Sequence, residues 1–487
     1  MSQTSRTTEP SPARIRGIER RTIDMIPADE RHGTPLNQFT LWFGANLQIT
    51  AIVDGALAVI FGADALWAII GLFIGQVLGG IVMALHSAQG PRLGLPQMIS
   101  SRAQFGVYGA AIPLVLVVML YLGFASTGTV LSGQAINSFL GLGANAPWVG
   151  IGIFAGLTAL VAIVGYNLIH VLGRISSVIG IIGLGYLAIR LFMTHDFSEP
   201  IRTSAFDLPT FLLAVSLSAG WQMTYGPYVA DYSRYLPQDT KESHTFWATW
   251  LGSVLGATIA MTLGVFIAVA GGPAFLKNQV GYLGQLAGPA WVALIIYLVI
   301  VVGKLTINTL NAYGGFMSIA TTFSAFTGRE RLSPRARVVW VILFNLVAAG
   351  IALLASADFL ANFRNFILAL LLVFTPWSAI NLTDYYLVSK ERVDIPALYD
   401  PRGRYHAWNW GTIGVYLFGV AIQIPFMSQT LYTGPMVEKL GGTDISWILG
   451  LVVTVLIYYP VAKRSVVQPD AMIYPAPTET VRVLERD

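Results

Sequence analysis

Long apolar stretches separated by short polar segments recur along almost the whole chain of 487 residues. A helix that crosses the hydrocarbon core of a membrane needs about 20 consecutive, mostly apolar residues. Twelve stretches meet this condition, and we expect each to form a transmembrane helix. Their approximate limits are 38–61, 65–86, 110–136, 148–169, 175–193, 208–229, 245–270, 288–316, 336–355, 358–380, 409–427 and 446–462.

The composition agrees with this pattern. The chain is 55% hydrophobic and 11% charged, so it lacks the charged residues that a soluble surface requires. The polar end segments, 1–36 and 464–487, contain no apolar core stretch, and we expect them to be tails around one transmembrane domain, 37–463. The predicted fold class is therefore an all-α polytopic membrane protein.

Basic residues are distributed unevenly between the segments that connect the apolar stretches. With both termini on the same side, only Arg202, Lys277 and Lys439 fall in the opposite loops. Because short cytoplasmic loops carry an excess of Lys and Arg, we expect both termini to be cytoplasmic in a cell membrane. The same asymmetry explains the basic composition without a nucleic-acid partner.

Residues that often carry enzymatic or metal chemistry are scarce. The chain has no cysteine, and its 6 histidines lie at helix ends or in loops without metal-ligand spacing. Within the apolar stretches the titratable candidates are Lys304, Asp54 and a few tyrosines. We therefore expect no metal, no cofactor and no enzymatic activity. A channel is also disfavoured, because it would need a ring-forming filter.

Two predicted helices contain glycines and polar residues near their middle. The first includes FGANLQITAIVDG at 43–55, and the sixth includes SLSAGWQMTYGP at 216–227. Such residues are tolerated at membrane depth only where they are buried in protein or line a cavity. Because these helices are five apart in order, they are typical of an inverted repeat whose broken helices bind small molecules and ions.

Two further helices carry unusual side chains. In the eighth, Lys304, Asn308 and Asn311 share one helical face, which therefore cannot face lipid. Bonds to another helix would explain the asparagines, but an ionised lysine at this depth costs several kcal/mol unless it is paired or hydrated, roughly 3 kcal/mol on insertion scales. We interpret Lys304 as functional. In the third helix, Tyr121 and Phe124 by themselves indicate only packing.

Five segments occur in a recognisable order along nearly the whole chain. They are ERRTI at 19–23, PRLGLPQMISSRAQFG at 91–106, GYNLIH at 165–170, VADYSRY at 229–235, and 376–390, which contains TDYYL. With them the chain resembles the nucleobase:cation symporter-1 family, and specifically its purine-cytosine permease branch. The resemblance implies a LeuT-type fold, in which helices 1–5 and 6–10 are inverted repeats and helices 11 and 12 are peripheral.

The resemblance also implies where a ligand would bind. Family members hold a planar heterocycle between aromatic rings of helices 3 and 6, and amides of helices 1 and 8 bond its edge. The matching residues of this chain are Gln48, Phe124, Gly220, Trp221, Asn308 and Asn311. Phe124 stands where the family often has tryptophan, so Tyr121 is an alternative stacking partner.

The implied cation site departs from the sodium-dependent members, in which carbonyls of helix 1 and hydroxyls of helix 8 surround the ion. The matching positions are Gly44, Leu47, Val302, Leu305 and Thr306. Leu305 lacks the hydroxyl, and Lys304 beside it is a titratable cation that can stand in for sodium. Asp54 is a second candidate proton carrier. We therefore favour a proton over sodium as the coupling ion.

On this resemblance we expect a monomeric symporter that imports a nucleobase such as cytosine, adenine or hypoxanthine by alternating access. The alternative is a proton- or sodium-coupled importer of a related heterocycle, such as a hydantoin, allantoin, uracil or a vitamin precursor.

Overall fold

A computed structural model describes residues 25–142, 146–164, 166–327, 334–430, 432–465 and 468–475. Within these residues the chain is helical, and extended pairing is limited to the isolated bridges Asp394–Ile473 and Ser428–Thr433. This confirms the predicted all-α class. The segment 19–23 and most of both predicted tails lie outside the described residues.

Each predicted span corresponds to a helix or to a split helix. Seven described helices are long and apolar enough to cross a membrane. They are α3 (Ala65–Leu93), α6 (Ala111–Phe139), α12 (Glu242–Lys277), α14 (Ala290–Thr327), α15 (Pro334–Ala355), α16 (Phe359–Leu382) and α19 (Ser446–Ser465). Spans 4, 5 and 11 correspond to α7 (Pro147–Val164), α8 (Tyr166–Thr194) and α17 (Trp410–Ala421), whose described apolar parts are shorter.

Spans 1 and 6 are both split, as predicted. Span 1 consists of α1 (Pro35–Asn46) and α2 (Ile49–Ile60), which are bent by 60° at the break. Span 6 consists of α10 (Leu208–Met223) and α11 (Gly226–Ser233). Gln48 has extended backbone angles, and a proline lies in the first turn of α11, where it supplies no N–H to continue the ladder of α10.

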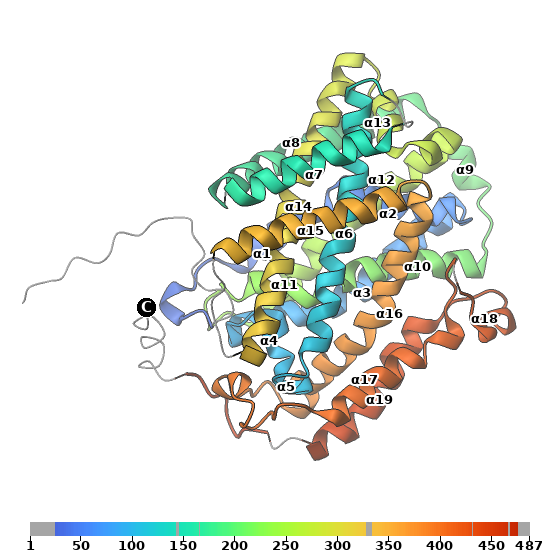
Figure 1. Ribbon diagram of the computed structural model, residues 1–487. Helices are drawn as coiled ribbons and strands as arrows, with labels where there is room; N and C mark the ends of the chain where they lie inside the picture. The colour runs from blue at the N-terminus through green and yellow to red at the C-terminus, as the bar shows by residue number, and fades with distance from the viewer. Residues whose placement is uncertain are drawn as a thin grey trace, which may run out of the picture.

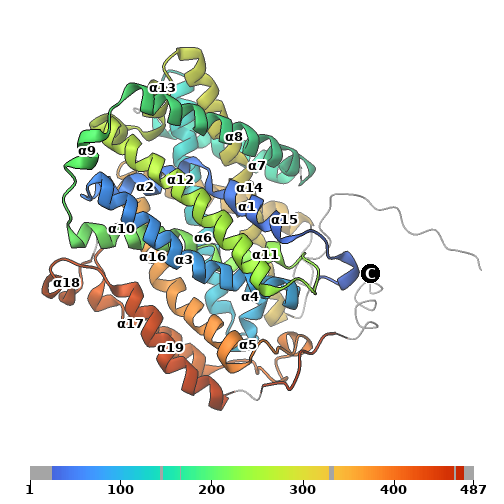
Figure 2. The same cartoon turned by 180° about the vertical axis from the view of Figure 1, so that it is seen from behind.

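The helix contacts follow the symmetry of an inverted repeat, in which span n of the first half corresponds to span n+5. Both halves of span 1 pack along α12 (span 7), and both halves of span 6 pack along α3 (span 2). The contact between spans 3 and 4 has its counterpart in the contact between spans 8 and 9. The contact between spans 5 and 8 has its counterpart in the contact between spans 10 and 3. Figure 2 shows α3 and α12 side by side.

Spans 11 and 12 lie at one edge of the molecule. In Figure 1, α17 and α19 run together beside α16, with which both make contact. Large apolar side chains are exposed on several outer helices, including Met193, Leu354 and Leu456. Because a soluble surface does not expose apolar side chains so extensively, we assign this surface to lipid.

One boundary differs from the prediction. Span 4 was expected to run to residue 169, whereas α7 ends at Val164 and α8 already begins at Tyr166. The segment GYNLIH at 165–170 mixes apolar residues with Asn167 and His170, so the apolar stretch has no sharp end there. The intervening Gly165 lies outside the described residues.

Short helices and connecting segments cover both ends of the bundle. Two of them, α4 (Gln97–Ser100) and α5 (Arg102–Phe105), insert between the ends of the long helices, and the Arg102 guanidinium donates to the carbonyls of Thr321 and Leu398, both at 3.2 Å. The remaining short elements are η1 (Ala28–Glu30), α9 (Ser198–Arg202), α13 (Gln279–Ala287), η2 (Thr383–Val388), η3 (Pro396–Tyr399), η4 (Ile424–Phe426) and α18 (Pro435–Lys439).

Candidate binding site between the broken helices

Two aromatic side chains of spans 3 and 6 face each other at the level of the breaks. The Phe124 and Trp221 ring centroids are 5.8 Å apart and the ring planes are perpendicular, at 90°. Trp221 is buried and Phe124 is half-buried. Because the rings touch edge to face, a flat ligand can lie between them only after one ring has moved. Tyr121, the alternative stacking partner, instead contacts Tyr228 at 5.6 Å.

The two asparagines of α14 have different surroundings. Asn308 is buried and its amide nitrogen donates to the Ala125 carbonyl at 2.8 Å and to Thr129 Oγ1 at 3.1 Å, both on α6. Asn311 is half-buried, and its amide nitrogen has no hydrogen-bond partner within the described residues. Asn308 therefore joins two helices, whereas Asn311 has donors available to a ligand.

Lys304 reaches across to the break in span 1. Its ammonium donates to Gln48 Oε1 at 2.7 Å and also to the hydroxyl of Thr50. Gln48 is half-buried, and its amide nitrogen donates to the Ala45 carbonyl at 2.9 Å. The proposed coupling cation and a predicted ligand-binding amide are thus in direct contact, although they are 256 positions apart in the chain.

Asp54 lies one turn beyond Thr50 on α2 and is fully buried. Neither carboxylate oxygen has a hydrogen-bond partner within the described residues. Asp54 and Lys304 therefore form no ion pair with each other within the described residues. An unpaired charge at this depth is costly.

The positions that match a sodium cage supply few free oxygens here. Leu305 packs in an apolar cluster with Ile136 and Phe154, away from span 1. The Thr306 hydroxyl donates to the Val302 carbonyl of its own helix at 3.3 Å. At the break itself, the Gly44 carbonyl accepts the Leu47 amide at 3.2 Å.

Gly220 precedes Trp221 and is buried against α16. A Cβ added there would lie 3.0 Å from the Ile367 side chain, so little room is left for a larger residue. Asn46 is not among the site residues predicted from the sequence, and it accepts a hydrogen bond from the indole nitrogen of Trp221 at 2.7 Å. Its place within the interrupted stretch at 43–55 was the signal that could have identified it.

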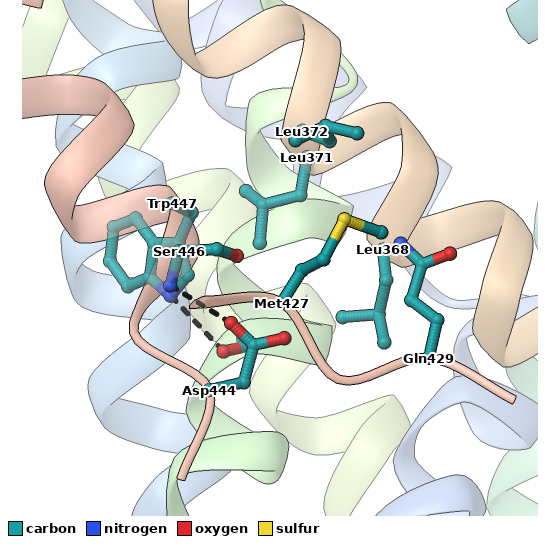
Figure 3. Close-up of a pocket in the computed structure, with 9 residues that line it drawn as sticks. Leu368, Leu371, Leu372, Met427, Gln429, Asp444, Ser446 and Trp447 are labelled. Atoms are coloured by element: carbon teal, nitrogen blue, oxygen red, sulfur yellow. Dashed lines mark hydrogen bonds between the residues drawn. The ribbon is translucent and has the colours of Figure 1, made fainter. Parts of the chain in front are cut away.

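A small cavity that none of these residues lines lies between α10, α16 and the segment that precedes α19 (Figure 3). Its volume of about 10 Å³ is close to the space needed for one water molecule. The Asp444 carboxylate beside it accepts the amides of Ser428 at 2.7 Å and Ser446 at 2.9 Å. The lining residues are Ser216, Leu368, Leu371, Leu372, Met427, Gln429, Asp444, Ser446 and Trp447. The cavity is too small for a heterocycle, and its acid is used to cap a helix.

Paired broken helices within an inverted repeat define the protein as a membrane transporter. Residues 25–450 match the family of permeases for cytosine/purines, uracil, thiamine and allantoin, and the chain belongs to that family. It is 39% identical over 446 residues to YxlA of Bacillus subtilis (strain 168), provisionally named a purine-cytosine permease, covering 92% of this chain and 96% of the relative. It is 27% identical to the purine-cytosine permease fcyB of Emericella nidulans, covering 89% and 86%. This family consists of permeases and not of enzymes.

Solved structures agree on the fold. The inward-facing conformation of Mhp1 matches with a TM-score of 0.76 at 19% identity, covering 95% of this chain and 99% of Mhp1. Mhp1 closed around bromovinylhydantoin, described as a nucleobase-cation-symport-1 family transporter, matches with a TM-score of 0.68 at 20% identity, covering 92% and 95%. The predicted LeuT-type architecture with broken helices 1 and 6 is confirmed.

Proposed function

We propose that the protein imports a nucleobase, cytosine or a purine such as adenine or hypoxanthine, across the cell membrane together with a proton. The names of the relatives support the substrate class, and Mhp1 supports the architecture. The observation that carries the coupling is the hydrogen bond between Lys304 and Gln48 at 2.7 Å.

The chemistry of the candidate site suits a nucleobase. Trp221 and Phe124 offer aromatic faces, and stacking of a base on such a ring contributes about 1–3 kcal/mol. Asn311 and Gln48 supply amide groups, which match a donor and acceptor edge in either orientation. The ligand needs no charged partner, in contrast to an amino acid, whose carboxylate and ammonium would both have to be paired.

Lys304 links proton binding to substrate binding through Gln48. The protonated ammonium fixes the carbonyl end of the Gln48 amide, while one N–H of the amide nitrogen is bonded to Ala45. The second N–H is then held in a defined direction and is free for a ligand. Loss of the proton weakens this hold, so the substrate leaves more readily. By thermodynamic reciprocity, bound substrate raises proton affinity by the same factor, typically about 5- to 150-fold.

Uptake into proteoliposomes tests substrate and ion together. Labelled cytosine and adenine are offered under an inward proton gradient, with sodium replaced by potassium, and unlabelled hydantoin, allantoin and uracil serve as competitors. We expect saturable nucleobase uptake that follows the proton gradient and ignores sodium. Strong competition by allantoin or hydantoin with no nucleobase uptake would support the related-heterocycle alternative, and loss of uptake on sodium removal would support sodium coupling.

The Lys304→Met variant tests the coupling residue. A gradient of one pH unit corresponds to about 1.36 kcal/mol and supports up to about tenfold accumulation with one proton per substrate. We expect Lys304→Met to lose this accumulation, because within the described residues no other cation bonds Gln48. Lys439→Met, in a predicted external loop, is the matched control and should accumulate substrate normally. Proton-driven accumulation that persists in Lys304→Met would remove the lysine from the mechanism.

The proposed orientation places both termini in the cytoplasm, with residues 1–36 and 464–487 as tails. Because the chain has no native cysteine, single cysteines can be introduced without background. A cysteine at Lys439 should react with an impermeant reagent from outside, and a cysteine at Lys241 should not. The reverse result would overturn the orientation. Size-exclusion chromatography with light scattering tests the expected monomer.

A further inference from the structure

A fully buried asparagine at the end of α1 uses every hydrogen-bonding position of its side chain. Asn46 Oδ1 accepts from the Trp221 indole at 2.7 Å and from the Tyr225 hydroxyl at 3.2 Å. Its amide nitrogen donates to the Trp42 carbonyl at 2.7 Å and to Ser253 Oγ at 3.0 Å. An amide has two donor hydrogens and an oxygen with two lone pairs, so all four are paired.

The bonds continue beyond Asn46 through three other helices. The Ser253 hydroxyl of α12 donates to Gln222 Oε1 at 2.7 Å, next to Trp221 in α10. The Gln222 amide in turn donates to Gln76 Oε1 of α3. The chain of side-chain bonds thus runs from the break of span 1 to the residues just before the break of span 6. It involves none of the groups assigned above to ligand or ion except Trp221.

The two aromatic walls of the candidate site are held very differently. Trp221 is 2% exposed, and its indole nitrogen is bonded to Asn46. Phe124 is half-buried, and it makes ring contacts with Trp221 and with Phe366, at 5.2 Å, and packs against the surrounding apolar clusters. Movement of Phe124 would break no hydrogen bond, whereas movement of Trp221 would break its bond to Asn46.

We propose that Asn46 is a positioning residue, which fixes the plane of the Trp221 ring by bonding it to α1, the first half of broken span 1. This rests on the proposed function, because it presupposes that Trp221 stacks on the substrate. Without the Asn46 oxygen, the buried Trp221 N–H and Tyr225 O–H lose their acceptor, and the indole can turn toward other partners. The stacking surface is then no longer preorganised, and the ligand must order it on binding.

Uptake kinetics of Asn46→Ala, Trp221→Phe and the double variant test this proposal. We expect Asn46→Ala to raise KM by about tenfold or more, with Vmax per surface molecule changed by less than about twofold. If Asn46 acts through Trp221, the KM of the double variant should be no more than about twofold above the larger KM of the two single variants. Multiplication of the two effects, or an unchanged KM in Asn46→Ala, would overturn the proposal.

Two further variants separate positioning from folding. Asn345→Ala is the matched control, because Asn345 is also buried in a helix and its side chain, within the part of the chain that the structure describes, bonds the Val341 carbonyl alone, at 2.8 Å. It should leave KM unchanged. Ser253→Ala removes one partner of Asn46 and leaves the indole bond in place, and we expect its KM to rise by about threefold. This variant tests the proposal even if Asn46→Ala does not reach the membrane. An unchanged KM in Ser253→Ala together with a lowered melting temperature would assign the cluster to folding alone.

The design distinguishes this inference from the proposed function. If the wild-type protein takes up no nucleobase, the proposed function fails before any variant is compared. If the wild type shows saturable uptake but KM is the same in Asn46→Ala, the positioning role alone fails.

Discussion

The contact between α12 and broken span 1 leads to a prediction that the structure makes quantitative. A Cβ built on Gly264 of α12 lies 1.9 Å from the Ile52 carbonyl oxygen and 3.0 Å from the Ala56 nitrogen. The contact is reciprocal, because a Cβ on Gly55 of α2 would lie 2.2 Å from the Met261 carbonyl oxygen. Backbone therefore meets backbone, as it does where small residues line membrane helix interfaces.

The Gly264→Ala substitution forces these helices apart. Real Cβ contacts under 3.0 Å are essentially never found, so the Ile52 carbonyl must retreat by at least about 1 Å. Overpacking of this kind costs about 1–3 kcal/mol or more, whereas alanine gains at most about 1 kcal/mol of helix propensity over glycine. The steric overlap outweighs the gain in helix propensity and makes the substitution destabilising, because backbone cannot move aside as a flexible side chain can. We expect a net loss of roughly 1–2 kcal/mol.

Thermal unfolding of the purified protein in detergent measures this loss. Gly414→Ala in α17 is the matched control, because a Cβ there has nothing within 4 Å. The control should melt at or above the wild-type temperature, and Gly264→Ala should melt below it. Displacement of α2 also moves Thr50 relative to Lys304, so the dependence of uptake on the proton gradient should weaken. A Gly264→Ala protein that melts like the wild type would refute the close approach.

Three further predictions concern the site and its frame. Phe124→Ala should raise the KM for a nucleobase by roughly 5- to 150-fold, the equivalent of about 1–3 kcal/mol of stacking, whereas Tyr121→Phe should change this KM by less than about twofold. Equal effects of the two variants would contradict the assignment of Phe124 as the stacking residue. Asn308→Ala removes two hydrogen bonds to α6 and should lower the free energy of unfolding by roughly 0.6–1.7 kcal/mol, measured as a lower melting temperature. A raised KM at unchanged stability would show that Asn308 contacts the ligand instead. Asp207→Ala removes the N-terminal cap of α10 and should cost about 1 kcal/mol in the same melting assay with KM unchanged; no loss would mean that water replaces the cap.

The sequence by itself determined the helices and the places where two of them break. In lipid every backbone group has to be bonded within its own helix, so a run of about 20 apolar residues has few alternatives. The polar residues and glycines of 43–55 and 216–227 marked the breaks for the same reason, because they cannot face lipid. The boundary between α7 and α8 was misplaced, because GYNLIH at 165–170 mixes apolar residues with Asn167 and His170 and gives the apolar stretch no sharp end.

Only the tertiary structure decided which of the marked residues meet. Lys304 and Asn311 share one face of α14, yet Lys304 bonds Gln48 across the break, while the Asn311 amide nitrogen has no partner among the residues that the structure describes. Phe124, and not Tyr121, faces Trp221, although the two are separated by less than one helical turn.

The role of Asn46 was hidden for the same reason. Its bond to Trp221 joins residues that are 175 positions apart. Periodicity shows which side of a helix is polar, but the partner across the gap depends on how separate helices cross. That crossing is set by backbone contacts such as the one between Gly264 and Ile52, which no local pattern in the sequence specifies.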